Sequence, residues 1–271
     1  MPSDKRARQR AAREERLAAE ARAKKRRKQI RNTVIVVVIA GVILLIVFLT
    51  SSNSPKKSTS STTTTTVAGH SKDATLQAAA NKIAVADGCP ASTSARVNTQ
   101  QYSAAPPMTI NTADTYSATI KTTTGTFTIA LDAKAAPVTV NSFVFLADKG
   151  YFHCNIFHRV IPSFVDQTGD PTGTGTGGPG YEFANENIPK AYATGDVAMA
   201  NSGANTNGSQ FFIVAPGGAS TLDADLSSGG YSLFGQVTSG QNVVNTINNQ
   251  GTSSGTPAVV QRMLSVTIHT S

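Results

Sequence analysis

The 271-residue chain has no tryptophan and only two cysteines. Its two most distinctive stretches, residues 157–167 and 199–212, carry no plausible nucleophile with a base beside it. Without an assembled triad, hydrolysis by a membrane-tethered hydrolase is the least favoured activity.

Metal ligands and cofactor motifs are equally sparse. His153, Cys154 and His158 lie close in sequence, but alternation along a strand would turn His153 and His158 to opposite faces, and we interpret His158 as structural. Residues 175–180 fit G-x-G-x-x-G, yet Pro179 interrupts them and no helical pattern follows. We therefore expect no metal, no nucleotide and no other cofactor.

Outside the N-terminal region the chain has no net positive charge, although its overall net charge is +8. Of the 24 Lys and Arg, 13 lie in residues 1–31 with 4 of the 16 Asp and Glu, which leaves 11 basic against 12 acidic residues elsewhere. A folded nucleic-acid-binding domain needs a basic face. No nucleic-acid partner is expected for the body of the protein.

The N-terminal region predicts a membrane anchor. Residues 1–32 form a basic tail of helical propensity, for which anionic lipid or RNA binding is an alternative to a solvated tail. Residues 33–50 are uncharged and apolar, long enough to span a bilayer. A signal peptide is the rival interpretation, but the polar lead is long and no small-x-small cleavage pattern follows. Since no cysteine follows the apolar run, a lipoprotein anchor is disfavoured.

The distribution of Lys and Arg around residues 33–50 predicts the orientation. Because the basic residues are dense on the N-terminal side, the positive-inside rule leaves the N-terminus in the cytoplasm. We expect a single-pass cell-membrane protein whose catalytic domain is extracytoplasmic.

Two segments connect this anchor to the main domain. Residues 51–70 are rich in Ser and Thr and predict a flexible linker. Residues 71–112 form a neck, with an Ala-rich helix over 73–86, that either packs on the main domain or is partly disordered. The main domain is expected over residues 113–271.

The main domain has the pattern of a mainly β fold. We expect strands over residues 116–121, 126–131, 155–161, 164–168, 195–200, 210–214, 232–237 and 262–270. One helix opens at Pro137 and closes at Lys149-Gly150, and a second covers residues 241–248. The pattern favours a closed antiparallel barrel with helical caps, and a sandwich remains the alternative.

Two stretches carry the candidate site. Residues 157–167 bring the guanidinium of Arg159, the ring of Phe164 and the carboxamide of Gln167 close together on strand-like sequence. Residues 199–212 add another ring and two more amides, namely Phe212, Asn201 and Gln210. These groups can bind and polarise an amide but are poorly equipped to cut one, which points toward rotation about a bond.

These stretches closely resemble the signatures of the cyclophilin family of peptidyl-prolyl isomerases. The matching segments are 157–162, Phe164, Gln167, Gly169-Asp170, 175–178, 199–202, 205–213, Leu222-Asp223 and Phe234-Gly235-x-Val237. The resemblance covers roughly residues 115–270, and together with the predicted anchor it suggests a membrane-anchored, bacterial-like form. It implies a closed eight-stranded antiparallel barrel capped by two helices, with the active groove on its outer face.

The resemblance also implies roles for single residues. Arg159 matches the family's catalytic arginine, and Gln167 and Asn201 would act with it on the substrate backbone. The remaining substrate-binding positions are Phe164, Val165, Ala200, Ser202, Gln210, Phe212, Leu222 and Tyr231.

Some positions depart from the family pattern. Val165 stands where many members have Met, and Thr168 where Gly is usual. Thr221 takes the place of a tryptophan, and Tyr231 that of a histidine. The loop after Asp170 is about one residue short, and residues 224–230 contain a small insertion. The missing tryptophan argues against tight cyclosporin binding more than against catalysis.

The implied activity is isomerisation of X-Pro bonds, with proline-containing polypeptides as substrates and folding of extracytoplasmic proteins as its use. Peptide-bond rotation faces a barrier of about 18–20 kcal/mol, so a catalyst must stabilise the twisted state. The alternative from another class is a non-catalytic proline-binding chaperone or scaffold tethered to the membrane, which the substitutions at Val165, Thr168 and Thr221 keep open. A monomeric catalytic domain is expected.

Cys89 and Cys154 are the only cysteines. Both lie on the oxidising side of the predicted membrane segment, which favours a disulfide between them. The alternative is two unpaired thiols, one of them buried.

Overall fold

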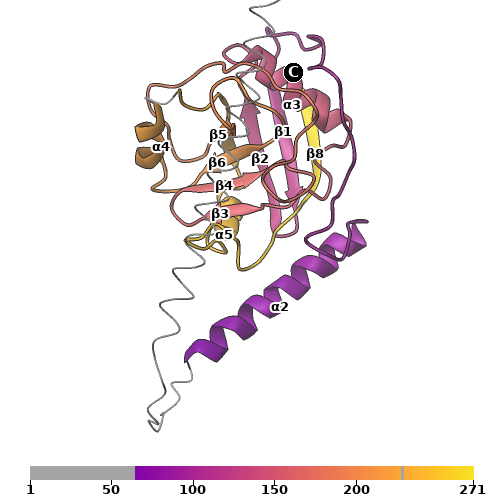
Figure 1. Ribbon diagram of the computed structural model, residues 1–271, viewed down its shortest axis with the longest axis vertical. Coiled ribbons are helices and arrows are strands. Elements are labelled where there is room, and N and C mark those ends of the chain that lie inside the picture. The colour runs from indigo at the N-terminus through magenta and orange to yellow at the C-terminus, as the bar shows by residue number, and fades with distance from the viewer. Residues whose placement is uncertain (1–64, 227–228) are drawn as a thin grey trace, which may run out of the picture. The chain divides into compact units, whose positions relative to one another are not determined.

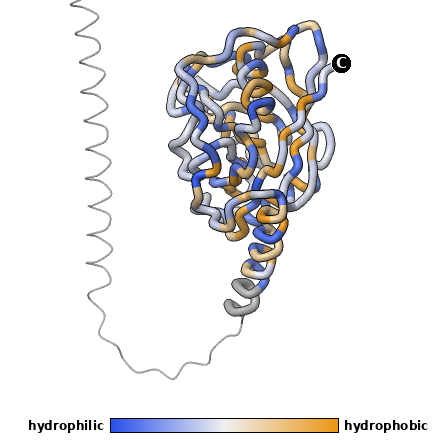
Figure 2. The backbone as a smooth tube through the Cα atoms, turned by 90° about the vertical axis from the view of Figure 1, so that its right-hand side faces the viewer, coloured by the Kyte–Doolittle hydropathy of each residue, from blue (hydrophilic) through white to orange (hydrophobic). Residues whose placement is uncertain are grey.

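The computed structural model describes residues 65–226 and 229–271 (Figure 1). The predicted tail 1–32, the predicted membrane segment 33–50 and residues 51–64 of the predicted linker lie outside this range. Among the described helices, none combines the length and the apolar character needed to cross a membrane. The longest of them, α2, mixes hydrophobic and hydrophilic residues along its length (Figure 2).

Eight strands form one sheet, as the mainly β prediction required. They are β1 (Tyr116–Thr122), β2 (Gly125–Leu131), β3 (Arg159–Ile161), β4 (Val165–Thr168), β5 (Asp196–Met199), β6 (Phe211–Val214), β7 (Leu233–Ser239) and β8 (Met263–Thr270). Their order is β3-β4-β6-β5-β7-β2-β1-β8, and every neighbouring pair is antiparallel. The fold class is therefore mainly β, in a curled sheet rather than the alternative sandwich (Figure 1).

Alternation along the strands places a hydrophobic core inside the curl. Tyr116, Ala118 and Ile120 of β1 are buried and lie opposite buried residues of β2. Phe211 and Ile213 of β6 join the same core, whereas Phe212 and Val214 belong to a second cluster. Because successive side chains of a strand point to opposite faces, β6 supports a core on both of its sides. Each fully buried large side chain stabilises the fold by about 1.5–3 kcal/mol.

The prediction of a fully closed barrel needs correction. The edge strands β3 and β8 share no ladder in the described chain, and the edges meet only where residues 154–157 approach the start of β8. There Ile156 bridges Arg262, and Phe157 N donates to Gln261 O at 3.0 Å. β3 is short because the chain turns at Pro162-Ser163, so no continuous strand remains for a longer ladder.

The described part of the barrel domain has three helices rather than the two that the resemblance implied. α3 (Pro137–Asp148) and α5 (Gln241–Asn248) match the predicted helices, and α4 (Ala219–Asp225) was not predicted. With only seven residues, α4 is too short to show a helical period. The Glu186 carboxylate accepts from Val138 N at 3.1 Å and Thr139 N at 2.7 Å, which stabilises the start of α3.

The neck is packed on the domain. Helix α2 (Thr65–Ala86) begins at residue 65 instead of 73, so residues 65–70 are helical and not the flexible linker their composition suggested. Once the Ala-rich turns have nucleated a helix, each added residue costs little free energy. Gln77 exchanges hydrogen bonds with the backbone of Val260, at 3.3 and 2.7 Å, and Ala80 and Ala84 are buried.

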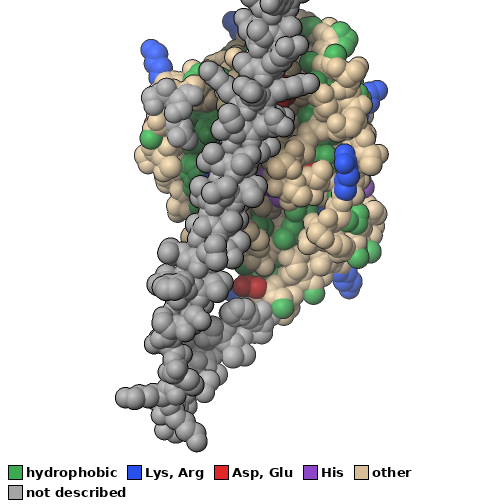
Figure 3. Space-filling view, viewed as in Figure 1, with side chains coloured by type: hydrophobic (Ala, Val, Ile, Leu, Met, Phe, Trp, Pro, Cys, Tyr) green, Lys and Arg blue, Asp and Glu red, His purple; other side chains and the backbone are tan. Residues whose placement is uncertain are grey.

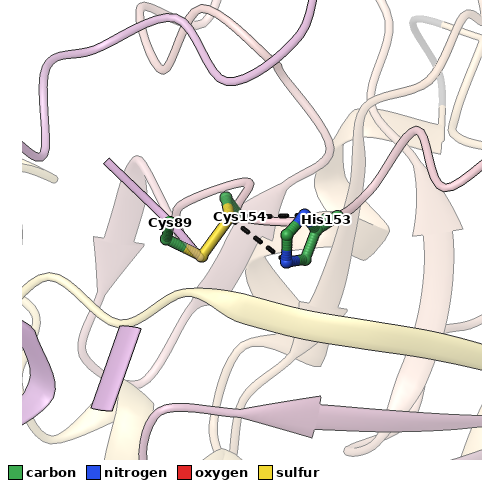
Figure 4. Close-up of side chains that lie close together, drawn as sticks. All are labelled: Cys89, His153 and Cys154. Atoms are coloured by element: carbon green, nitrogen blue, oxygen red, sulfur yellow. Dashed lines mark hydrogen bonds between the residues drawn. A yellow bond between two sulfur atoms is a disulfide. The ribbon is translucent and has the colours of Figure 1, made fainter. Parts of the chain in front are cut away.

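The expected bridge between Cys89 and Cys154 is present (Figure 4). Both sulfurs are buried with Ala84 and Leu264, and the bond spans a sequence separation of 65. It joins the end of the neck helix to the segment that leads into β3.

Candidate active site

The β3–β4 hairpin positions the first half of the site. Arg159 and Gln167 face each other across the hairpin, and Arg159 Nη1 donates to Gln167 Oε1 at 3.3 Å. The guanidinium carbon lies 5.5 Å from the centroid of the Phe164 ring. Contact with a ring face stabilises a cation and fixes its direction. The arginine is therefore held by an amide and a ring while its remaining donors stay available.

The turn of this hairpin is tied to helix α5. Ser163 has φ 58° and its backbone N–H donates to Asn248 Oδ1 at 3.0 Å. Asn248 Nδ2 donates in turn to Ile161 O at 3.1 Å and to Asp166 Oδ1 at 2.7 Å. A positive φ is costly for a residue with a side chain, and these bonds hold it in place. The position of Phe164 thus depends on a helix more than 80 residues away in sequence.

Strand β6 supplies the second half. Phe212 lies opposite Gln167 on β4 and opposite Ala198 on β5. Its ring packs edge-on against Tyr231, with centroids 5.2 Å apart and an interplanar angle of 89°. Val165, Leu222 and Phe212 are each at most 3% exposed, on the outer face of the sheet. Helix α4 contributes Leu222 to this group, so the helix covers Val165 and Phe212 on the outer face.

A small cavity of about 230 Å³ lies among these side chains. Its lining consists of Arg159, Phe164, Val165, Gln167, Ala200, Asn201, Phe212, Leu222 and Tyr231. All nine are predicted site residues, so the structure brings that set together around one opening. The remaining two, Ser202 and Gln210, do not line it.

Ser202 and Gln210 lie instead on a larger, polar cavity of about 540 Å³. The two cavities share Gln167, Ala200 and Asn201, so they are adjacent parts of one groove. Gln210 Oε1 accepts from Gln167 Nε2 at 3.0 Å, and Gln210 Nε2 donates to Gly175 O at 3.0 Å and Gly177 O at 2.9 Å. The large cavity is walled mainly by backbone and amide groups, with Glu182 as its one charged lining residue.

The loop that forms this wall is organised by Asp170, a residue for which the sequence predicted no separate role. Its carboxylate accepts from the backbone N–H groups of Thr172, Thr174, Gly175 and Gly177, at 2.6–3.1 Å. Burial works to raise the pKa of Asp170, but these donors outweigh it and the pKa is lowered. Asp170 stays ionised at neutral pH and fixes the loop. The run of Thr and Gly residues that follows Asp170 is the sequence feature that could have predicted a loop organised by this carboxylate.

Asp166 is a second residue whose role the sequence did not reveal. Its side chain is fully buried on the face of β4 opposite to Val165 and Gln167. Burial raises its pKa to about 7, with the hydrogen bond from Asn248 acting in the opposite direction. His158 is partly buried as well, and burial lowers the pKa of its ring, which is neutral at pH 7.

One group of possible metal ligands lies together in the described part of the chain, namely Cys89, His153 and Cys154 (Figure 4). Their ligand atoms lie within 4.8 Å of one another. Both sulfurs are bonded in the disulfide, so neither is available as a thiolate. On the visible face in Figure 3, the Lys and Arg side chains of the described residues are scattered rather than gathered.

Comparison with known proteins shows to which family the chain is similar. Residues 117–269 match the family model described as cyclophilin type peptidyl-prolyl cis-trans isomerase/CLD. Peptidyl-prolyl cis-trans isomerase-like 1 of Aspergillus fumigatus is 48% identical over 129 residues, covering 45% of this chain and 76% of the relative. The peptidyl-prolyl cis-trans isomerase of Helicobacter pylori is 41% identical over 131 residues, covering 48% and 77%. Relatives come from fungi and bacteria, so they do not single out a bacterial form.

Solved structures agree with the fold. A crystal structure of a Cryptosporidium parvum cyclophilin type peptidyl-prolyl cis-trans isomerase covers 57% of this chain and 98% of its own, with a TM-score of 0.51 and 32% identity. A second structure of that protein was determined in the presence of the dipeptide Ala-Pro, with a TM-score of 0.50.

Proposed function

The protein belongs to the cyclophilin-type peptidyl-prolyl cis-trans isomerase family, whose model matches more than half of the chain, and we propose that the small cavity is where it turns X-Pro bonds. The observation that carries this assignment is a guanidinium, held by Gln167 and Phe164, that lines the same cavity as the apolar side chains of Phe212 and Leu222. The domain is an isomerase, and the roles of single residues are the proposal.

The chemistry required is stabilisation of a twisted amide. Before proline, cis and trans differ by only about 0.5–1 kcal/mol, yet they interconvert over tens to hundreds of seconds. When the bond twists, the lone pair returns to the prolyl nitrogen and can accept a hydrogen bond. The guanidinium of Arg159 is always charged and has a rigid fork of donors, so it supplies that bond without a proton transfer.

The other lining residues hold the substrate in place. Phe164, Phe212 and Leu222 contact the proline ring, because they form the apolar wall of the small cavity. Gln167 and Asn201 hold the backbone on either side, so one part of the peptide turns while the other stays fixed. The Ala-Pro dipeptide named with the Cryptosporidium relative supports a proline-sized occupant.

Replacing Arg159 by Ala tests this role. One preorganised donor in a partly dry site contributes roughly 3–4 kcal/mol to a transition state. The Arg159→Ala variant should therefore lose a factor of several hundred in kcat/KM for a short X-Pro peptide in a protease-coupled assay. Arg159→Lys keeps the positive charge but lacks the forked guanidinium donors. Its kcat/KM should lie between those of the native protein and Arg159→Ala.

Lys134→Ala, at an exposed cation away from the cavity, is the matched control and should retain normal turnover. Circular dichroism checks that each variant is folded. Near-normal kcat/KM for Arg159→Ala would remove the arginine from the mechanism. Proline-peptide binding by the native protein with no turnover would support a proline-binding chaperone instead.

We also propose that the domain acts outside the cytoplasm, on exported polypeptides, while held by the apolar segment 33–50. Support comes from the basic residues on the N-terminal flank of that segment and from the disulfide, since such bonds persist in oxidising compartments. Protease added to intact cells should digest the domain, and alkaline carbonate should leave the protein in the membrane fraction. Release by carbonate, or full protection from protease, would contradict the placement.

A further inference from the structure

A segment of the neck forms part of the groove. Residues 97–102, here called the strap, run along the loop 171–181 that walls the large cavity. Val97 N donates to Pro171 O at 2.9 Å, and Tyr102 N donates to Pro179 O at 2.8 Å. Gly180 has φ +94°, and a Cβ there would lie 2.7 Å from Tyr102 O. Only glycine lets the loop approach the strap this closely.

The strap lies outside the part of the chain shared with the family. The family match begins at residue 117, after the strap has ended. The contacts between the strap and the loop 171–181 therefore lie outside the matched family region. They are a property of this chain.

Gln101 is the strap residue that lines the large cavity. Its Nε2 donates to Gly178 O at 2.7 Å and to Gln100 O at 2.8 Å, so both amide hydrogens are used. Within the described residues, its Oε1 accepts no hydrogen bond. The amide oxygen is thus left as an acceptor beside the cavity, together with the exposed carboxylate of Glu182.

A chain of hydrogen bonds connects Gln101 to the catalytic arginine. Arg159 donates to Gln167, Gln167 to Gln210, and Gln210 to the carbonyls of Gly175 and Gly177. The next carbonyl, that of Gly178, accepts from Gln101. The loop 175–178 is therefore held on one side by Gln101 of the strap and on the other by Gln210, which is linked through Gln167 to Arg159.

The strap is itself firmly held. Asn98 Nδ2 donates to Tyr151 O at 2.7 Å, and the Tyr102 ring packs edge-on against Phe145 with centroids 4.9 Å apart. The disulfide fixes the chain just before it, at Cys89. An anchored segment keeps its geometry when substrate binds, which is what selectivity requires.

We propose that Gln101 is a specificity-determining residue, which selects polypeptides with a hydrogen-bond-donating side chain, neutral or basic, beside the proline. This proposal rests on the proposed function, because it takes the small cavity as the proline site. The acceptors of the large cavity, Gln101 Oε1 and Glu182, match donors such as the side chains of Lys and Gln. The shared lining residues place that side chain next to the proline.

The test uses a series of short proline peptides in which each flanking position in turn is Ala, Gln or Lys. Turnover is measured by NMR exchange spectroscopy with the full chain. For at least one position, the native protein should prefer Gln or Lys to Ala. Gln101→Ala should reduce that selectivity ratio about three- to tenfold, the effect of losing one hydrogen bond. In Gln101→Lys, the positive charge at position 101 should repel Lys peptides. The preference for Gln peptides over Ala peptides should fall less than the preference for Lys peptides.

Thr99→Ala is the matched control, because Thr99 is an exposed strap residue that does not line the cavity, and its ratios should equal those of the native protein. Equal ratios for Gln101→Ala and the native protein would overturn the proposal. If the native protein turns over no peptide, the proposed function fails instead. Binding of the same peptides, measured by chemical-shift titration, then gives the same ratios and tests Gln101 separately.

Discussion

Asp166 shows how a single residue beside the small cavity can affect the whole fold. It lies between Val165 and Gln167 on β4 but is turned inward, and its Oδ2 has no hydrogen-bond partner among the described residues. An ionised carboxylate in that position has the single donor Asn248 Nδ2, on Oδ1, which does not offset its loss of hydration. The folded state therefore prefers the protonated acid.

This preference predicts a pH dependence of stability. The pKa of Asp166 is about 7 in the folded state, against 3.8 ordinarily, so the folded state holds the proton more tightly. The contribution of this residue to stability is greatest below pH 4 and falls as pH rises toward 7. The Asp166→Asn variant should be more stable than the native protein at pH 8, by on the order of 4 kcal/mol.

Urea unfolding of both proteins between pH 4.5 and 8 measures this effect. The stability difference should grow up to about pH 7 and then stay constant. A difference that does not change with pH would contradict the assignment. Asp148→Asn, which makes the same substitution at an exposed aspartate, is the matched control.

At the residue scale, the structure brings together those predicted site residues whose motif is local. Residues 157–167 and 199–212 contain most of the small cavity, so the sequence and its resemblance to the family located them. Asn248 and Gln101 were missed because their partners lie far away in the chain, 85 and 77 residues respectively. Neither Gln nor Asn has a sequence pattern that reveals such a partner.

At the scale of elements, the loop 170–177 depends on one carboxylate. Asp170 accepts four backbone N–H groups, and the loop in turn holds Gln210 through two carbonyls. A carboxylate among converging N–H groups is a strong anchor, since hydrogen bonds to charged groups contribute about 1.5–3 kcal/mol each.

Replacing Asp170 by Asn should loosen this loop. The amide keeps one acceptor oxygen but turns an NH2 group toward backbone donors, so about half of the bonds are lost. We expect destabilisation of roughly 2–4 kcal/mol and a several-fold loss of kcat/KM, because Gln210 and Gln167 lose their support. Thermal unfolding and the peptide assay measure the two effects. The single change Lys134→Ala, at an exposed residue that lines neither cavity, should leave both nearly unchanged. An unaltered kcat/KM in Asp170→Asn would show that the loop does not support the site.

Most strands, and helices α3 and α5, were predictable from alternation and helix-end signals. The strand expected over residues 155–161 is shorter, because β3 begins only at Arg159. β1, β2, α3 and α5 lie within a residue or two of their predicted ends. Helix α4 was missed because seven residues give no period, and α2 was predicted too short because Ser and Thr suggested a linker. Barrel closure was overestimated, since sequence pattern does not show how two edges meet.

At the scale of the whole molecule, the disulfide joins the neck to the barrel. It closes a loop with a separation of 65 residues, for which the chain-entropy model gives about 4 kcal/mol of stabilisation. The double variant Cys89→Ser, Cys154→Ser should therefore unfold at a clearly lower temperature than the oxidised native protein.

Reduction of the native protein with a dithiol should produce a similar fall in unfolding temperature. The double serine variant is the control, because a reductant should not change its unfolding temperature. If reduction leaves the native protein equally stable, the bond does not contribute to the folded state. The sequence suggested this pairing only as one of two alternatives, because two cysteines alone do not reveal their distance.

The bond between Cys89 and Cys154 has a practical consequence for laboratory work. A recombinant fragment trimmed to the family match would begin after Cys89 and keep Cys154. Such a fragment would carry an unpaired sulfur that can cross-link two copies, and it would lack Gln101. Kinetic constants and inhibitor screens obtained with it would describe a different groove from that of the intact chain.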